Sequence, residues 1–157
     1  MTETVNNQAL VLFQIEGQYY ALPLSIVERV VRAVEITPLP KAPDIISGVI
    51  NVQGQVIPVV NVRKLFRLPA REMALDDRLI IARTARRRVA LMVDSVADVR
   101  EVPEQEIANA RQALPFAAYL RGVARIAEGL VLIHDLDQFL SLDEEQALDV
   151  ALSGGAK

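Results

Sequence analysis

His134 is the single histidine of the chain and the side chain best suited to proton transfer near neutral pH. Asp135 follows it, and a carboxylate that orients an imidazole is a common partner of a catalytic histidine. Both lie in an apolar run, residues 130–136, whose composition is typical of a strand. Because successive strand side chains point to opposite faces, the two groups are not expected to pair. The sequence predicts a strand histidine that is partly exposed or hydrogen-bonded and has no catalytic role.

Acidic side chains concentrate in residues 94–106. Two carboxylates act as acid and base when a pocket holds them together, but no spacing here forces such a pair, so the stretch is interpreted as a polar face and turn. No serine has a nucleophile-elbow context, and no glycine-rich loop opens a helix to hold phosphate. One histidine without any cysteine supplies too few ligands for a zinc site. We therefore expect no enzyme, no cofactor and no metal.

Arg83, Arg86, Arg87 and Arg88 form the only basic cluster. Nucleic-acid recognition favours a broad basic face with aromatic side chains that stack on bases. A formal charge of -3 and an aromatic content of 4% offer neither. The cluster is interpreted as the solvated tip of a hairpin, and the alternative is a docking contact to an acidic partner.

The composition bounds the class of protein that must position these groups. With 157 residues, of which 52% are apolar and 24% charged, the chain has enough material for one globular domain. The absence of cysteine excludes disulfides and thiolate chemistry. The N-terminal residues lack the pattern of a signal peptide, and the apolar runs are too short to span a bilayer, so we expect a cytoplasmic protein.

Three segments each show two apolar, β-type runs around a turn. The first has runs at residues 10–15 and 19–24 around Gly17-Gln18, and the second has runs at residues 49–52 and 56–60 around Gly54-Gln55. The third has runs at residues 79–83 and 89–93 around the polar residues 85–88. Glycine adopts positive φ without steric cost, so the first two turns are predicted to be tight. Pro38, Pro40 and Pro43 keep the approach to the second hairpin extended.

The β pattern occurs twice. Aligning Ala21 with Ala90 matches the following apolar positions at an offset of 69 residues, and aligning Gly48 with Gly122 matches a second set at an offset of 74. The extra residues of the later copy fall in residues 109–118, which we expect to form a loop or short helix. Two similar β units predict two small barrels packed as pseudo-symmetric subdomains.

Helical signals are few. Residues 25–30 and 62–67 are each predicted to form one turn, and Pro69 stops the second. Ser141 and Glu144 have the spacing of a capping box, which predicts a C-terminal helix over residues 142–152, ended by Gly154-Gly155.

Residues 48–54 (GVINVQG) and 56–63 (VIPVVNVR) resemble the CheW family of chemotaxis coupling proteins. The resemblance also covers residues 20–23, 27, 30, 36–40, 93–96, 120–123 and 133–136, and so spans about 10–140. It implies an all-β fold with two pseudo-symmetric SH3-like five-stranded β-barrel subdomains, short helices and a C-terminal helix. It also implies a single CheW-like domain over residues 1–157, with repeat-like β units at about 10–66 and 79–140 and the helix at about 142–152.

The resemblance implies a non-enzymatic adaptor that couples chemoreceptors (methyl-accepting chemotaxis proteins) to a CheA-type histidine kinase. The adaptor would dock on the regulatory domain of the kinase and on the cytoplasmic tips of the receptors, without a cofactor, nucleic acid or membrane insertion. It would be cytoplasmic and recruited to receptor arrays at the inner face of the membrane. The family's partner-binding positions fall on Val27, Ile36 and Gly48, with apolar contact expected for the first two and close backbone approach for the glycine.

Two positions differ from the usual pattern of the family. Gln53 stands where the hairpin commonly carries an arginine, and Arg29 stands where a glutamate is frequent. Because charges at the rim of an interface set partner choice, both are predicted to be partner-binding residues that alter specificity. An alternative hypothesis is a CheW-like scaffold of another chemosensory or motility pathway, and a distant one is a small β-barrel that binds nucleic acid.

Overall fold

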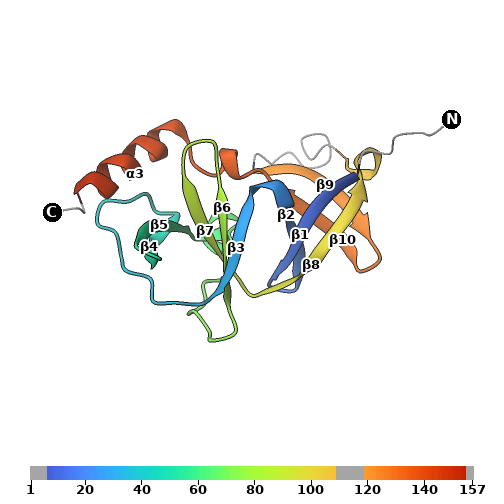
Figure 1. Cartoon of the computed structure of the whole chain (residues 1–157), viewed down its shortest axis with the longest axis horizontal. Coiled ribbons are helices and arrows are strands. Elements are labelled where there is room, and N and C mark those ends of the chain that lie inside the picture. The colour runs from blue at the N-terminus through green and yellow to red at the C-terminus, as the bar shows by residue number, and fades with distance from the viewer. Residues whose placement is uncertain (1–6, 109–118, 155–157) are drawn as a thin grey trace.

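The computed structural model describes residues 7–108 and 119–154. Within them, ten strands form two five-stranded sheets that lie side by side along the long axis of the molecule, and a helix lies at one end (Figure 1). The prediction of a β fold with two five-stranded sheets, short helices and a C-terminal helix is confirmed. Residues 109–118, where a loop or short helix was expected, lie outside the described part of the chain.

The first sheet, called sheet 1 below, has the strand order β8-β1-β2-β10-β9. Its strands are β1 (Asn7–Ile15), β2 (Gln18–Pro23), β8 (Ser95–Pro103), β9 (Leu120–Ile126) and β10 (Gly129–His134). Sheet 2 has the order β3-β6-β7-β5-β4. Its strands are β3 (Val27–Arg32), β4 (Ile46–Val52), β5 (Gln55–Val60), β6 (Arg78–Arg83) and β7 (Arg88–Val93). The helical elements are η1 (Leu24–Ile26), α1 (Val62–Leu65), η2 (Glu104–Glu106), η3 (Leu136–Gln138) and α3 (Leu142–Gly154).

Each sheet combines strands from both repeats. Sheet 1 takes the β1–β2 hairpin from the first repeat and β8, β9 and β10 from the second, whereas sheet 2 takes β6–β7 from the second and β3, β4 and β5 from the first. The two sheets have the same strand order when each strand is replaced by its equivalent in the other repeat, as matched by the sequence offsets. Each sheet contains one parallel pair, which is β2–β10 in sheet 1 and β5–β7 in sheet 2. The chain therefore crosses between the sheets after β2 and again after β7.

Two hairpin turns lie one residue earlier than predicted. Their central residues are Glu16-Gly17, with φ of 54° and 76°, and Gln53-Gly54, with φ of 51° and 83°. Of the two-residue hairpin turns that match the strand twist, type I′ has positive φ at both central positions, as here. Glycine supplies the second of these, and the residue before it must adopt the left-handed conformation as well.

Alternating side chains divide most of the core between three clusters, and a fourth, smaller one surrounds Leu120. On β6, Ile80 and Ala82 belong to a cluster that sheets 1 and 2 share, while Leu79 and Ile81 belong to a cluster of sheet 2 alone. Sheet 1 has its own cluster around Leu12 and other buried aliphatic residues. Both faces of each sheet are thus covered, which explains why several strands are apolar at almost every position.

The segment after β2 differs from the prediction. A helical turn was expected over residues 25–30, but only Leu24–Ile26 is helical, and Val27–Arg32 is strand β3. The branched side chains of this segment favour extended backbone, and pairing with β6 satisfies its backbone groups. β3 is consequently an edge strand of sheet 2.

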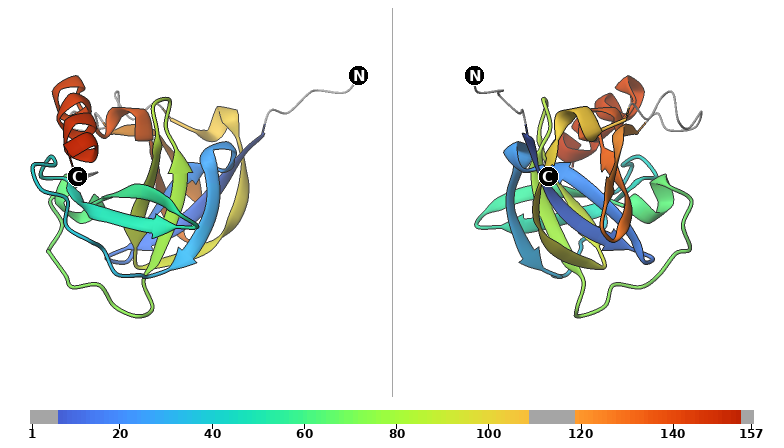
Figure 2. Two further views of the ribbon diagram at one scale, coloured as in Figure 1. Left: turned by 60° about the vertical axis from the view of Figure 1, so that its left-hand side comes forward. Right: turned by 90° about the vertical axis from the view of Figure 1, so that its right-hand side faces the viewer.

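The C-terminal helix begins at a capping box, as predicted. The backbone N–H of Glu144 donates to Ser141 Oγ over 3.2 Å, and the backbone N–H of Ser141 donates to Glu144 Oε1 over 3.0 Å. Helix α3 lies beside sheet 2, away from sheet 1 (Figure 2). None of the helices in the described ranges is long and apolar enough to cross a membrane.

Candidate partner-binding site

All five predicted site residues lie in or beside sheet 2. Val27 and Arg29 are on the edge strand β3, and Gly48 is on the opposite edge strand β4. Gln53 is in the β4–β5 turn, and Ile36 is in the segment that joins β3 to β4. The positions are therefore grouped around one sheet, although they come from separate elements.

Arg29 and Gln53 line one hollow on sheet 2. Its volume is about 240 Å³, and both residues are exposed at its edge. Ile57 and Ile81, which are buried, form part of its floor. The two positions that depart from the family pattern thus share one surface, although they are 24 residues apart in the sequence.

Arg88 crosses this hollow. Its Nε lies 2.9 Å from Glu28 Oε2, and its Nη1 donates to Gln55 Oε1, so it links β7 to β3 and β5. The Glu28 and Arg88 side chains are about one-third exposed, so the pair contributes to the charge of the surface more than to stability. Arg29 forms no ion pair within residues 7–108 and 119–154.

Gly48 makes room for the segment that contains Ile36. A Cβ atom at this position would lie 2.3 Å from the Thr37 carbonyl oxygen and 2.8 Å from Ile36 Cγ2, and the φ of Gly48 is +154°. Thr37 and Val49 exchange backbone hydrogen bonds of 2.9 and 2.8 Å across this contact. The close approach predicted for this glycine is therefore made within the chain, by the segment that pairs with β4.

Val27 and Ile36 are only partly accessible. Ile36 packs against the cluster of sheet 2, and Val27 packs against the cluster that the two sheets share. Neither lines the hollow of Arg29 and Gln53. The apolar side chain that β3 exposes is Val30, at 41% exposure. The structure brings together Arg29 with Gln53 and Ile36 with Gly48, while Val27 belongs to neither pair.

A partly buried ion-pair network was missed by the sequence interpretation of Asp94 as part of a polar turn. Arg63 Nη2 lies 2.7 Å from Asp94 Oδ1, and Arg63 Nη1 donates to Glu16 and, over 3.0 Å, to the Pro69 carbonyl. Arg71 Nη2 lies 2.7 Å from Asp94 Oδ1 as well. Burial favours a higher pKa for Asp94, but hydrogen bonds from the Glu16 backbone and both arginines outweigh it, and the pKa is lowered. These partners are far apart in the sequence, so no local pattern signals them.

His134 is buried, which contradicts the prediction of a partly exposed or hydrogen-bonded histidine. Its exposure is 1%, and neither ring nitrogen has a hydrogen-bond partner in the described part of the chain. The imidazole stacks on Phe66 at a centroid distance of 4.7 Å and meets Tyr20, Phe139 and Phe13 edge-on. Burial lowers its pKa to about 3, so the ring is neutral near pH 7. The expectation that it does not pair with Asp135 is confirmed.

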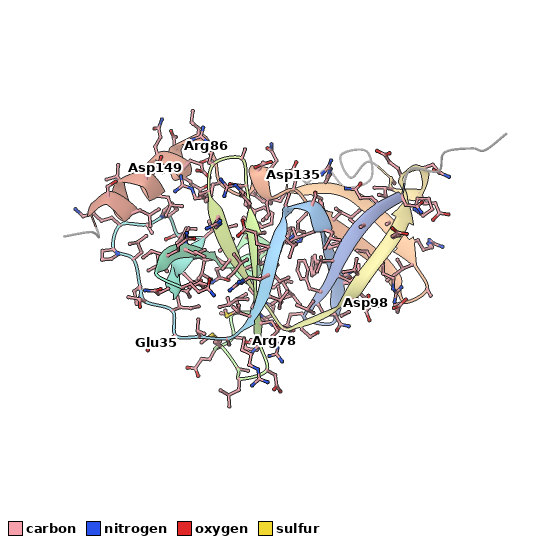
Figure 3. The ribbon with its side chains drawn as sticks, in the orientation of Figure 1. Glu35, Arg78, Arg86, Asp98, Asp135 and Asp149 are labelled. Carbon is pink, nitrogen blue, oxygen red and sulfur yellow. The ribbon has the colours of Figure 1, made fainter. Side chains whose placement is uncertain are left out.

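Arg87 also differs from its interpretation as part of a solvated tip. Its side chain is 14% exposed and lies 2.8 Å from Glu145 Oε2 and 2.5 Å from Asp149 Oδ1, both on α3. Arg86, at the tip of the same hairpin, is exposed (Figure 3). Of this cluster, Arg87 anchors the C-terminal helix. Among the described residues, no three His, Asp or Glu side chains are arranged to hold a metal ion.

Known proteins resemble the chain over most of its length. Residues 9–144 match the family model described as CheW-like domain. The chemotaxis protein CheW of Thermotoga maritima is 30% identical over 128 residues, which cover 82% of this chain and 84% of that protein. The chemotaxis protein CheW of Bacillus subtilis is 32% identical over 108 residues, 69% of either chain. The crystal structure of the scaffolding protein TtCheW from Thermoanaerobacter tengcongensis superposes with a TM-score of 0.79 at 28% identity, covering 88% of this chain and 96% of that one.

Proposed function

This chain belongs to the CheW family, and from that premise we propose that it is a chemotaxis adaptor that couples chemoreceptors to a CheA-type histidine kinase. The observation that carries the proposal is the match over residues 9–144 together with a fold that covers nearly all of a solved scaffolding protein. Proteins of this family act by binding, not by catalysis.

The partners follow from the family. The kinase would be bound through its regulatory domain and the receptors through their cytoplasmic tips, which places the adaptor in the cytoplasm, at receptor arrays along the inner face of the membrane. The candidate contact surface is sheet 2 with Val27, Arg29, Ile36, Gly48 and Gln53. Its support is the grouping of these positions around one sheet, with a hollow between β3 and the β4–β5 turn.

A second candidate is a CheW-like scaffold of another chemosensory or motility pathway. The observation that favours it is that Arg29 and Gln53 line the same hollow. Two departures on one surface alter its charge in a single place, and a partner with complementary charges would be selected there.

Co-purification from the host tests the adaptor function. The tagged protein should retain a histidine kinase and chemoreceptors under gentle conditions, and the identity of the kinase distinguishes the two pathways. Recovery of neither would count against coupling. Salt-sensitive binding of RNA would instead favour the nucleic-acid hypothesis.

Arg29→Glu and Gln53→Arg, which restore the family pattern, should change partner preference. Charges at the rim of an interface mainly change the association rate and its dependence on salt concentration. The ratio of the affinities for two of the host's kinase regulatory domains should therefore shift by about tenfold, and the salt dependence of binding should change. Titration calorimetry against each domain measures this ratio. Arg125→Glu, an exposed position on β9 of sheet 1, is the control, and an unchanged ratio in the two variants would refute the specificity role.

A further inference from the structure

The β6–β7 hairpin places two arginines directly opposite each other. Arg83 and Arg88 are partners in the antiparallel register of this pair. Like charges at such positions are unfavourable unless an acidic group lies nearby. Glu28 forms an ion pair with Arg88, whereas Arg83 has no acidic partner in the described ranges.

Arg29 lies on the same face of sheet 2. It is the register partner of Ile81, and Ile81 and Arg83 are two residues apart on β6, so their side chains share a face. That face carries the apolar cluster of sheet 2, to which Ile81 belongs. Arg29, Arg83 and Arg88 thus belong to the face of sheet 2 that carries its buried apolar cluster.

Two hollows join at Arg88. The first is the hollow of Arg29 and Gln53, and the second, of about 450 Å³, is lined by Arg83, Arg87 and Arg88 and by apolar side chains. Among the apolar lining, Val56 is 59% exposed. Gln55, Ile57 and Arg88 line both hollows, so the two hollows are adjacent.

The charges around these two hollows are unequally balanced. Arg87 is matched by Glu145 and Asp149 on α3, and Arg88 is matched by Glu28. Arg29 and Arg83 take part in no ion pair among the described residues, although the chain as a whole carries a formal charge of -3. The two hollows therefore have two cations available to an outside ligand.

We propose that this arginine groove, defined by Arg29, Arg83 and Arg88 and the two adjacent hollows that they line, binds an extended acidic segment of a partner protein. The inference rests on the proposed function and names the partner chemistry of that site. Carboxylates would pair with the guanidinium groups, and an apolar side chain between them would cover Val56. The apolar floor and the lack of stacking aromatic side chains favour a peptide over a nucleic acid.

Backbone NMR of the full chain tests the proposal with a synthetic peptide of alternating glutamate and valine and a matched peptide of glutamine and valine. The acidic peptide should shift the amide signals of Arg83, Arg88 and Val56 and bind at least about tenfold more tightly than the glutamine peptide. Equal binding of both peptides, shifts confined to another surface, or no shift with either would overturn the proposal. Tighter binding of single-stranded RNA than of the acidic peptide would also overturn it.

Charge variants provide the matched comparison. Arg83→Glu should weaken binding of the acidic peptide by about tenfold, Arg83→Lys should keep most of it, and Arg86→Glu, the same change at the tip of the same hairpin, should leave it within about twofold. If Arg83→Glu and Arg86→Glu weaken binding of the acidic peptide equally, the proposed binding groove is refuted.

The kinase regulatory domain separates this inference from the proposed function. If the wild-type chain binds that domain and Arg83→Glu binds it equally well, the groove is refuted and the adaptor function stands. If the wild-type chain binds neither the kinase nor a receptor, the adaptor function itself fails.

Discussion

Gly48 and Gly122 occupy equivalent places in the two repeats, each where a neighbouring segment lies against a strand edge. A Cβ at Gly122 would lie 2.6 Å from Ile107 Cγ2, much as one at Gly48 would lie 2.3 Å from the Thr37 carbonyl oxygen. The two glycines therefore have the same structural role, because each admits a segment that adds backbone hydrogen bonds to β4 or β9.

Gly48→Ala should lower the free energy of unfolding by about 3 kcal/mol, because the new Cβ both strains the backbone and displaces the segment at Thr37. Urea denaturation measures the change. Gly54→Ala is the control: the φ of Gly54 is +83° but its Cβ would meet open space, so only the strain of about 1 kcal/mol is expected. Equal losses in both variants would show that the close approach adds nothing.

His134 should make the protein less stable in acid. The unfolded chain protonates this imidazole near its ordinary pKa of 6.5, while burial keeps the folded pKa at about 3. Between these values only the unfolded state binds the proton, so the free energy of unfolding should fall by about 1.4 kcal/mol per pH unit below about 6.5. Thermal and urea unfolding from about pH 6.5 to about pH 4.5 measure the slope, above the range in which Asp94 contributes.

His134→Leu should abolish this slope, since leucine has no proton to gain and suits the surrounding aromatic rings. A variant that keeps the full slope would show that other groups cause the acid sensitivity.

Only part of the site was accessible to sequence reasoning at the level of single residues. The need for glycine at position 48 was predictable because glycine has a distinct steric property. The burial of His134 was not, because a strand histidine gives the same pattern whether its face meets solvent or four aromatic rings from separate segments.

At the scale of elements, α3 is attached to sheet 2 through Arg87. Arg87→Met should leave the buried carboxylate of Glu145 without its cation and lower the free energy of unfolding by about 2 kcal/mol. The loss should be concentrated in α3, so amide exchange should accelerate there more than in β6 and β7.

Hydrogen-exchange mass spectrometry reports this difference element by element. Arg86→Met, at the exposed tip, should leave exchange in α3 unchanged. Unaltered protection of α3 in the Arg87 variant would mean that the apolar contact of Leu148 holds the helix by itself.

The elements that were predicted well carry local signals. The hairpins around Gly17 and Gly54 and the capping box of Ser141 depend on residues a few positions apart. Strand β3 was not predicted, because its extended backbone depends on pairing with β6, about fifty residues away in the chain.

At the scale of the whole molecule, the exchange of strands between repeats predicts that neither repeat folds alone. The fragment of residues 1–73 would contain β1 and β2 without β8, β9 and β10, and β3, β4 and β5 without β6 and β7. Both of its partial sheets would expose core side chains to water.

Fragments 1–73 and 74–157 should each lack a cooperative thermal transition and should form a folded one-to-one complex when mixed. Circular dichroism and size-exclusion chromatography test both statements. Cooperative unfolding of either fragment by itself would contradict them and would favour repeats that are independent units.

The duplication was visible in the sequence, but the crossing of the chain between the sheets was not. Matching offsets reveal which strands are equivalent, for instance around Ala21 and Ala90, and leave open which equivalent strand each hairpin joins. That choice depends on long-range packing, in which Phe13 of sheet 1 and Leu91 of sheet 2 meet in one cluster.

Because each sheet needs strands from both repeats, the segment that joins the first repeat to the second acts as a tether. Two separate half-chains would have to find each other by diffusion, at a rate that falls with dilution. A short covalent link instead holds the second half at an effective concentration of about millimolar, whatever the number of molecules in the cell. Residues 67–77 thereby make assembly of the two sheets a unimolecular event, and the protein keeps its form even at very low copy number.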